Sequence, residues 1–351
     1  MNTLSKFLVA ILLTGSFISC SKDKDDPIIE VPVSEGSKLT LEGGEGGASA
    51  INSVFVDFSE DKQTSVERAS WDLGFYGGSD DFRVIINHST GGSAIALDKT
   101  DLNQVTAQDT ITLAEEGTLN VGHGSGSYSY LDPIEGGRSA YLSGTVIKAI
   151  SATDAENKVY IYARGNSGTS DRGWQKIRII RKGSGYTLQY AKINETSYKT
   201  LDVNKDDKYN FKYVSFDKGA VNVEPEKNAW DIEWGLSTYK ASPTIPYTFS
   251  DFVLINFVGG VTAAEVLTST VSYADFKESD LSSITFSGNR EVIAGNWRVT
   301  SGGTVGVKTD RFYLVKDTAG NVYKLKFVSF HANDGGERGK PVIEYALVKK
   351  A

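Results

Sequence analysis

Hydrophobic residues along this chain gather in short runs of about five to seven positions, separated by clusters of Gly, Asn, Asp and Ser. Val, Ile, Phe and Tyr dominate the runs, and such side chains favour extended strands. In the first half the pattern predicts antiparallel strands at residues 53–58, 82–87, 158–163, 176–180 and 186–190. Between the last two strands, residues 181–185 (RKGSG) predict a hairpin turn.

Helical periodicity is nearly absent from the chain. No long stretch places apolar residues three and four positions apart, so only single helical turns are expected, at 263–266 and within 273–280. Thirty-six glycines, 17 tyrosines and 16 phenylalanines with a single methionine agree with a β protein. The predicted fold class is therefore all-β, with few short helices.

The chain also resembles itself. Each half carries an aromatic run, a Trp-Asp pair, a strand that ends in Asn and a Gly-Gly pair, in that order. These features stand at 54–58, Trp71-Asp72, Asn87 and Gly91-Gly92, and again at 213–216, Trp230-Asp231, Asn256 and Gly259-Gly260. Late strands also correspond, with 159–163, 176–180 and 186–191 in the first half matching 312–317, 323–327 and 341–347 in the second. We therefore expect two tandem antiparallel β domains, residues 38–203 and 204–351, each long enough to bury a core.

The Trp-Asp pairs are interpreted as structural. A Trp ring suits a core, and the neighbouring Asp suits a turn that the backbone must hold.

The first nineteen residues predict an export signal. Lys6 precedes the apolar run 7–13, which is too short to cross a bilayer as a helix. The residues before Cys20, which is the only cysteine, resemble the lipobox of bacterial lipoproteins, so Cys20 is expected to carry a lipid anchor. Residues 20–37 are expected to form a flexible tether. Its Asp/Lys-rich start resembles the surface-export signal of Bacteroidetes lipoproteins, which favours the outer membrane's outer face.

Charge and motifs narrow the function. The net charge is −7 and no block of Lys or Arg occurs, so nucleic acid is not an expected partner. Residues 122–127 fit neither a nucleophile elbow nor a dinucleotide cradle. Three widely spread histidines make a zinc site improbable. No catalytic residues are expected, and the chain is interpreted as a binding protein rather than an enzyme.

The order of motifs resembles the HmuY-like haem-binding lipoproteins of Bacteroidetes. The second half carries the resemblance best, through Trp297, the aromatic strand 312–315, Gly320-Asn321 and the Lys-containing strand 323–327. The resemblance implies an antiparallel β fold that grips haem between loops, with iron held by two His or Met side chains. This sequence departs from that pattern. Met1, its only methionine, would be removed with the signal segment, and the positions expected for the family's later ligand, residues 297–303 and 141–153, contain no His.

Three histidines remain as possible iron ligands. His123 lies in a glycine-rich loop close to Tyr128 and Tyr130, and it is the predicted haem ligand, with both tyrosines as supporting candidates. His88 follows a strand end and is a weaker candidate, for which turn capping is the alternative. His331 ends another strand and is weaker still.

Two kinds of binding function stay open at this point. The first is capture of haem or a related porphyrin and its transfer to a TonB-dependent outer-membrane receptor. The alternative is a non-catalytic module for a glycan, peptide or host protein, in which Trp234, Tyr239 and Tyr247 would stack on the ligand. A third interpretation is a structural part of a surface complex.

Overall fold

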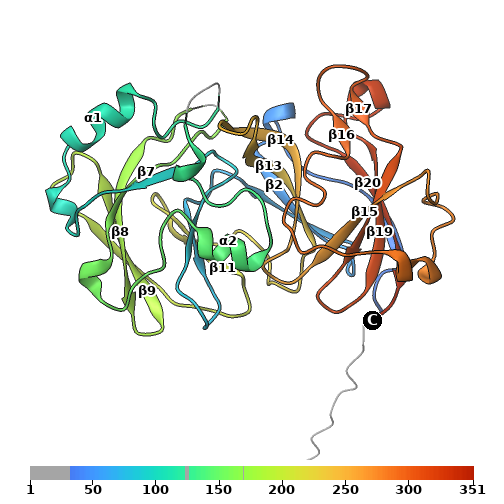
Figure 1. Ribbon diagram of the computed structural model, residues 1–351, viewed down its shortest axis with the longest axis horizontal. Coiled ribbons are helices and arrows are strands. Elements are labelled where there is room, and N and C mark those ends of the chain that lie inside the picture. Colours follow the sequence, from blue (N-terminus) through green and yellow to red (C-terminus); the bar gives the residue numbers. More distant parts are fainter. Residues whose placement is uncertain (1–31, 123–125, 169) are drawn as a thin grey trace, which may run out of the picture. The chain divides into compact units, whose positions relative to one another are not determined.

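The structure is a computed structural model that describes residues 32–122, 126–168 and 170–351 (Figure 1). Residues 1–33 and 34–351 are separate units, and everything below concerns the second unit. Cys20, the predicted signal segment and His123 lie outside the described residues.

The strands predicted from the hydrophobic runs are confirmed. In the first half they are β2 (Asn52–Asp57), β5 (Val84–Ile86), β7 (Val159–Ala163), β8 (Trp174–Lys182) and β9 (Gly185–Lys192). In the second half they are β11 (Phe211–Ser215), β18 (Arg311–Lys316), β19 (Val322–Ser329) and β20 (Val342–Lys349). The hairpin turn is also found: Lys182 pairs with Gly185, and Gly183 adopts a φ of 56° that side chains disfavour.

The helical expectations fare less well. Residues 263–266 belong to strand β15 (Thr262–Leu267), where Ala263 pairs with Val315 of β18, so the prediction of a helical turn there is wrong. Pairing with a buried neighbouring strand outweighs the helix propensity of two alanines and a glutamate. Within 273–280 the chain forms a turn, and a 3₁₀ helix follows at Glu278–Ser283. The described residues contain two short α-helices, α1 (Gln108–Glu115) and α2 (Arg138–Gly144).

Every strand pairing is antiparallel, which confirms the predicted fold class. The remaining strands are β1 (Gly36–Thr40), β3 (Lys62–Glu67), β4 (Leu73–Tyr76), β6 (Ser93–Ala96), β10 (Lys199–Val203), β12 (Gly219–Val221), β13 (Ile232–Lys240), β14 (Pro246–Ile255), β16 (Arg298–Val299) and β17 (Gly306–Val307). The sheet orders are β1-β20-β19-β18-β15, β10-β9-β8-β7-β6, β12-β11-β4-β5, β14-β13-β2-β3 and β16-β17.

The two repeats exchange their first hairpins. The β2–β3 hairpin of the first repeat pairs with β13, where Val56 lies opposite Ile232. The β11–β12 hairpin of the second repeat pairs with β4, where Val214 lies opposite Leu73. In Figure 1 the blue strand β2 accordingly runs beside the gold strands β13 and β14.

The strands therefore fall into two groups that share no sheet. We call β4–β12 the first group, and β1–β3 with β13–β20 the second group. The repeat units expected from the sequence, 38–203 and 204–351, do not coincide with these groups. The chain passes between groups twice, at residues 68–72 and 222–231, and each passage ends on a Trp-Asp pair.

The Asp of each pair secures an exchanged hairpin, as the structural interpretation requires. A carboxylate oxygen of Asp231 accepts the amide hydrogen of Phe58, and one of Asp72 accepts that of Phe216, each at 2.8 Å. Both carboxylates are buried. Each Trp-Asp pair therefore stands where one repeat is hydrogen-bonded to the hairpin of the other.

The Asn that ends each repeated strand secures the same two passages. The side-chain amide of Asn87 donates to the carbonyls of Arg68 and Trp71, at 2.8 and 2.9 Å. That of Asn256 donates to the carbonyls of Lys227 and Trp230, at 2.7 and 2.9 Å.

Three of the hydrophobic clusters show how the cores follow from this arrangement. One lies within the second group around Trp234 and Trp297, and one within the first group around Tyr162 and Phe75. A third core is shared by both groups. It contains Phe55, Trp71, Tyr76, Ile85, Tyr141, Leu142, Phe211, Tyr213, Val223, Trp230 and Val258.

Candidate functional site

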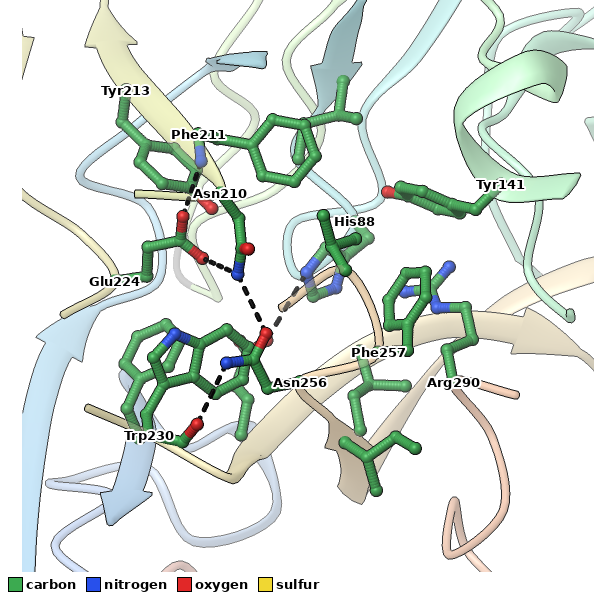
Figure 2. Close-up of a pocket in the computed structure, with 16 residues that line it drawn as sticks. His88, Tyr141, Asn210, Phe211, Tyr213, Glu224, Trp230, Asn256, Phe257 and Arg290 are labelled. Carbon is green, nitrogen blue, oxygen red and sulfur yellow. Dashed lines mark hydrogen bonds and ion pairs between the residues drawn. The ribbon is translucent and has the colours of Figure 1, made fainter. Parts of the chain in front are cut away.

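A cavity of about 40 Å³ opens within the core that both strand groups share (Figure 2). We call it the junction cavity. Aromatic side chains form part of its wall, and buried polar groups form another large part. Its polar lining residues are His88, Tyr141, Asn210, Tyr213, Glu224, Trp230, Glu233, Asn256 and Arg290.

A hydrogen-bonded chain of polar side chains crosses one side of the cavity. Glu224 accepts the amide hydrogen of Phe211 at 2.6 Å, and the side-chain amide of Asn210 donates to Asn256 Oδ1 at 2.9 Å. Figure 2 shows this chain continuing from Asn256 to the carbonyl of Trp230. Burial raises the pKa of Glu224 to about 8, so this carboxyl is mostly protonated at neutral pH.

His88 joins the two groups through its backbone and faces the cavity with its ring. Its carbonyl accepts hydrogen bonds from the amide and the hydroxyl of Thr238, at 3.0 and 2.8 Å. Its Nδ1 lies 3.2 Å from the hydroxyl oxygen of Ser237. Burial, with a smaller contribution from the charge of Arg290, lowers the pKa of His88 to about 3. The imidazole is therefore neutral at physiological pH.

Glu233 lies on the other side of the His88 ring, with its Oε2 3.7 Å from Nε2. Burial raises the pKa of this carboxyl to about 7. A neutral imidazole and a half-protonated carboxyl at that separation form neither an ion pair nor a hydrogen bond.

Arg290 supplies the cavity with a positive charge. The guanidinium carbon lies 4.9 Å from the ring centre of Tyr141 and 5.7 Å from that of Phe257, within the range of cation–π attraction. Nη1 donates to the carbonyl of Pro133 at 2.6 Å. Among the described residues, no carboxylate oxygen lies within 4.0 Å of this side chain, and its Nε–H has no hydrogen-bond partner.

The other predicted site residues do not converge on this cavity. The hydroxyl of Tyr128 lies 2.7 Å from the carbonyl oxygens of Ser242 and Ile245, so it fastens the turn between β13 and β14. Tyr130 packs against a separate hydrophobic cluster that includes Leu119. His331 accepts the amide hydrogen of Asn333 at 3.2 Å through Nδ1 and so caps a 3₁₀ turn.

A partly exposed group of aromatic rings lies on β13 and β14. We call Tyr239, Tyr247 and Phe249 the aromatic ribbon. The ring of Phe249 lies 5.2 Å from that of Tyr247 and 6.2 Å from that of Tyr239, in edge-to-face contact. Tyr247 is 36% exposed. Trp234, which the sequence grouped with these tyrosines, is fully buried and cannot stack on a ligand.

The predicted ligand loop comes close to this ribbon. A Cβ atom placed on Gly122 would lie 3.2 Å from Cδ2 of Tyr247, and one placed on Gly126 would lie 3.7 Å from Pro246. The residues that flank 123–125 therefore stand beside β14.

Several groups at the junction cavity escape prediction from sequence. Glu233 alternates with Ile232 and Trp234, as a solvent-facing residue of a strand does, while Glu224 and Arg290 stand close to other charged residues, as in solvated turns. Only their burial distinguishes them. Within the described part of the chain, no three His, Cys, Asp or Glu side chains cluster as a metal site, and no helix is long and apolar enough to span a membrane.

Comparison with known proteins finds a family match over most of the described unit. The family model described as HmuY protein matches residues 49–345, which include both strand groups. No curated protein matches the chain. A solved structure from Bacteroides vulgatus ATCC 8482, described as a candidate HmuY-like heme binding protein, is 10% identical with a TM-score of 0.21. The match covers 90% of this chain and 94% of that one.

Proposed function

This chain belongs to the HmuY family, and from that premise we propose that it binds haem or a related porphyrin for uptake. The match over residues 49–345 carries the proposal, because it spans nearly all of the described strands. We assign the protein a binding role without catalysis.

The aromatic ribbon is the surface that best suits a flat macrocycle. The junction cavity is too small, since sites for ligands of this size measure roughly 300–1,000 Å³ and the cavity measures about 40 Å³. Tyr247 instead offers a partly exposed ring beside Phe249. A porphyrin face can stack on such rings and bury apolar area from water.

His123 is the side chain that we propose as iron ligand. It follows Gly122, which lies against Tyr247. His88 is enclosed beside Ser237 and Glu233, and His331 caps a turn, so ligation by either would break contacts already made. Tyr128 is likewise engaged with two backbone carbonyls, which leaves Tyr128 and Tyr130 as positioning residues for the loop.

The cellular setting is part of the same proposal. Lipidation of Cys20 would hold the protein on the outer membrane, and the charged segment after it would let the binding unit reach away from the surface. A TonB-dependent receptor would then take over the porphyrin.

Haemin titration of the purified mature protein tests the proposal. We expect a shift of the Soret band that saturates, and loss of the shift in His123→Ala. His331→Ala serves as the matched control and should bind as the wild type does. A spectrum that stays that of free haemin at all protein concentrations would refute haem binding.

A glycan or peptide is the second candidate ligand for the ribbon. Tyr239 and Tyr247 lie opposite each other on β13 and β14, and both contact Phe249, an arrangement that also suits stacking on sugar rings. This alternative predicts no Soret shift, together with quenching of tyrosine fluorescence by oligosaccharides that Tyr247→Ala abolishes.

A further inference from the structure

The junction cavity contains more hydrogen-bond donors than the protein itself can satisfy. In the described part of the chain, the indole N–H of Trp230 and the Nε–H of Arg290 are buried without a partner. These two residues are 7% and 2% exposed, and Tyr141, which also lines the cavity, is 3% exposed. A buried donor without a partner costs about 1–3 kcal/mol, so two around one cavity require an explanation.

Charge is unbalanced at the same place. Arg290 is a buried cation, yet no described carboxylate lies within 4.0 Å of it. The nearby acids already have other partners: Asp132 accepts the amide hydrogens of Ile86 and Val146 at 2.8 and 2.9 Å, while Glu224 is held by Phe211 and Asn210. A buried charge normally has a counter-charge beside it.

The volume of the junction cavity limits the size of any bound group that could supply the counter-charge. One water molecule needs about 10–15 Å³ of such volume, so the cavity has room for a few atoms. Figure 2 shows the Tyr141 hydroxyl directed toward His88, with Arg290 beside the ring of Phe257. An occupant must therefore be small, must accept hydrogen bonds and should be negatively charged.

We propose that the junction cavity binds a monovalent anion of halide size between Arg290 and Tyr141. The anion would neutralise the guanidinium and accept the unpartnered Nε–H of Arg290. Because the walls come from both strand groups, it would also fasten one group to the other. This site is separate from the aromatic ribbon, and it stands or falls independently of porphyrin binding.

Crystals of the mature protein grown in sodium bromide test the proposal directly. We expect an anomalous bromine peak within the cavity. Density for water alone, with no anomalous signal, would overturn the proposal.

Thermal unfolding supplies a second test. In chloride or bromide the Tm should exceed that in sodium gluconate of equal ionic strength by about 2 °C or more, since gluconate is too large to enter. Tyr141→Phe removes one donor and should raise the halide concentration needed for half of that effect about tenfold. Tyr162→Phe is the matched control, because its hydroxyl contacts the carbonyl of Asp72 instead. A Tm that does not depend on the anion, or equal halide dependence in both variants, would contradict the site.

The halide effect should also depend on pH. The titratable or charged groups around Arg290 are His88, Asp132, Tyr141, Tyr213, Glu224 and Glu233. Below pH 6 the carboxyls of Asp132, Glu224 and Glu233 are mostly protonated and leave the charge of Arg290 to the anion. As the pH rises past 8 they ionise and displace it, so the halide increment in Tm should shrink. An increment that grows over this range would count against the proposal.

Discussion

Arg164 donates to both carboxylate oxygens of Asp72, at 2.8 and 3.1 Å, inside the contact between β4 and the exchanged hairpin. A second guanidinium, that of Arg172, lies 2.9 Å from the same carboxylate. Two arginines of the first repeat thus hold Asp72 in place, and Asp72 in turn accepts the amide hydrogen of Phe216 from the exchanged hairpin. Among the described residues, no Lys or Arg forms such an ion pair with the Asp of the second Trp-Asp pair. At that pair, burial raises the pKa of Asp231 well above its ordinary value.

Removal of this carboxylate should be costly. Asp72→Ala leaves the charge of Arg164 buried without its main partner, and we expect a loss of about 3–5 kcal/mol in the free energy of unfolding. Urea denaturation measures the loss. Asp217→Ala is the matched control, since that carboxylate also meets Arg164 but is 65% exposed, and it should cost under about 1 kcal/mol. Equal losses in the two variants would show that burial of the pair does not matter.

The contribution of Glu224 to stability should fall as the pH rises from acid to mildly alkaline values. The folded-state pKa of Glu224, about 8, exceeds the unfolded value near 4.3, so the folded protein binds more protons at this group between them. This contribution is therefore fully present below the unfolded pKa and declines by up to about 1.4 kcal/mol per pH unit until the folded pKa is passed.

Glu224→Gln isolates this contribution. The amide keeps the shape of the side chain but cannot ionise, so the slope of unfolding free energy against pH between 6 and 8 should flatten. Glu226→Gln, at an exposed position, should leave the slope unchanged. An unaltered slope in Glu224→Gln would mean that this carboxyl is ionised in the folded state.

The asparagines that hold the two passages should matter about equally. Asn87→Ala and Asn256→Ala each leave two buried backbone carbonyls without their hydrogen-bond donor. Each should therefore lower the unfolding free energy by about 1–3 kcal/mol. Hydrogen exchange should quicken at residues 68–72 and 227–231 respectively. Asn103→Ala, an exposed position, should have no measurable effect. If only one of the two variants has a lower unfolding free energy, the two asparagines do not contribute equally to stability.

Loss of the exposed ribbon ring should weaken porphyrin binding without unfolding the protein. We expect Tyr247→Ala to reduce haemin affinity about tenfold, which corresponds to the loss of one aromatic contact of about 1.5 kcal/mol. Tyr198 is almost equally exposed, at 38% against 36%, but lies outside the ribbon, so Tyr198→Ala provides the comparison. Unchanged titration curves for Tyr247→Ala would place the porphyrin elsewhere.

Fragments should fold according to strand groups. Residues 69–223 contain every strand of the first group, so this fragment should unfold cooperatively in circular dichroism. Residues 38–203 carry the β2–β3 hairpin but lack its partner β13, and they also lack β11, so this fragment should not. The reverse behaviour would show that the hairpins can return to their own repeats.

Sequence reasoning reached the strands and the repeat because Val, Phe and Tyr runs carry strong local signals. It could not reach the exchange of hairpins. The runs around Val56 and Val214 are so alike that β4 and β13 each offer either run an equivalent edge. Which hairpin pairs with which strand depends on the length and path of residues 68–72 and 222–231. The periodicity of hydrophobic residues carries no information about that path.

The candidate sites show the same limit. The histidines were visible as single residues, but the enclosure of His88 between Ser237 and Glu233 depends on β13 coming from the other repeat. The junction cavity could not be inferred, because its polar residues are scattered from His88 to Arg290 and gather only when the two groups meet.

The exchanged hairpins also impose an order on folding. Phe58 meets Asp231 across 173 residues, so the first hairpin to leave the ribosome, or to emerge through a membrane, has no partner until the second half of the chain arrives. All strand pairings of the first group can form once β12 has been synthesised. The early hairpin, in contrast, has unpaired edges and is prone to bind other chains. We therefore expect a newly made chain to be most prone to aggregation until β13 is available to pair with β2.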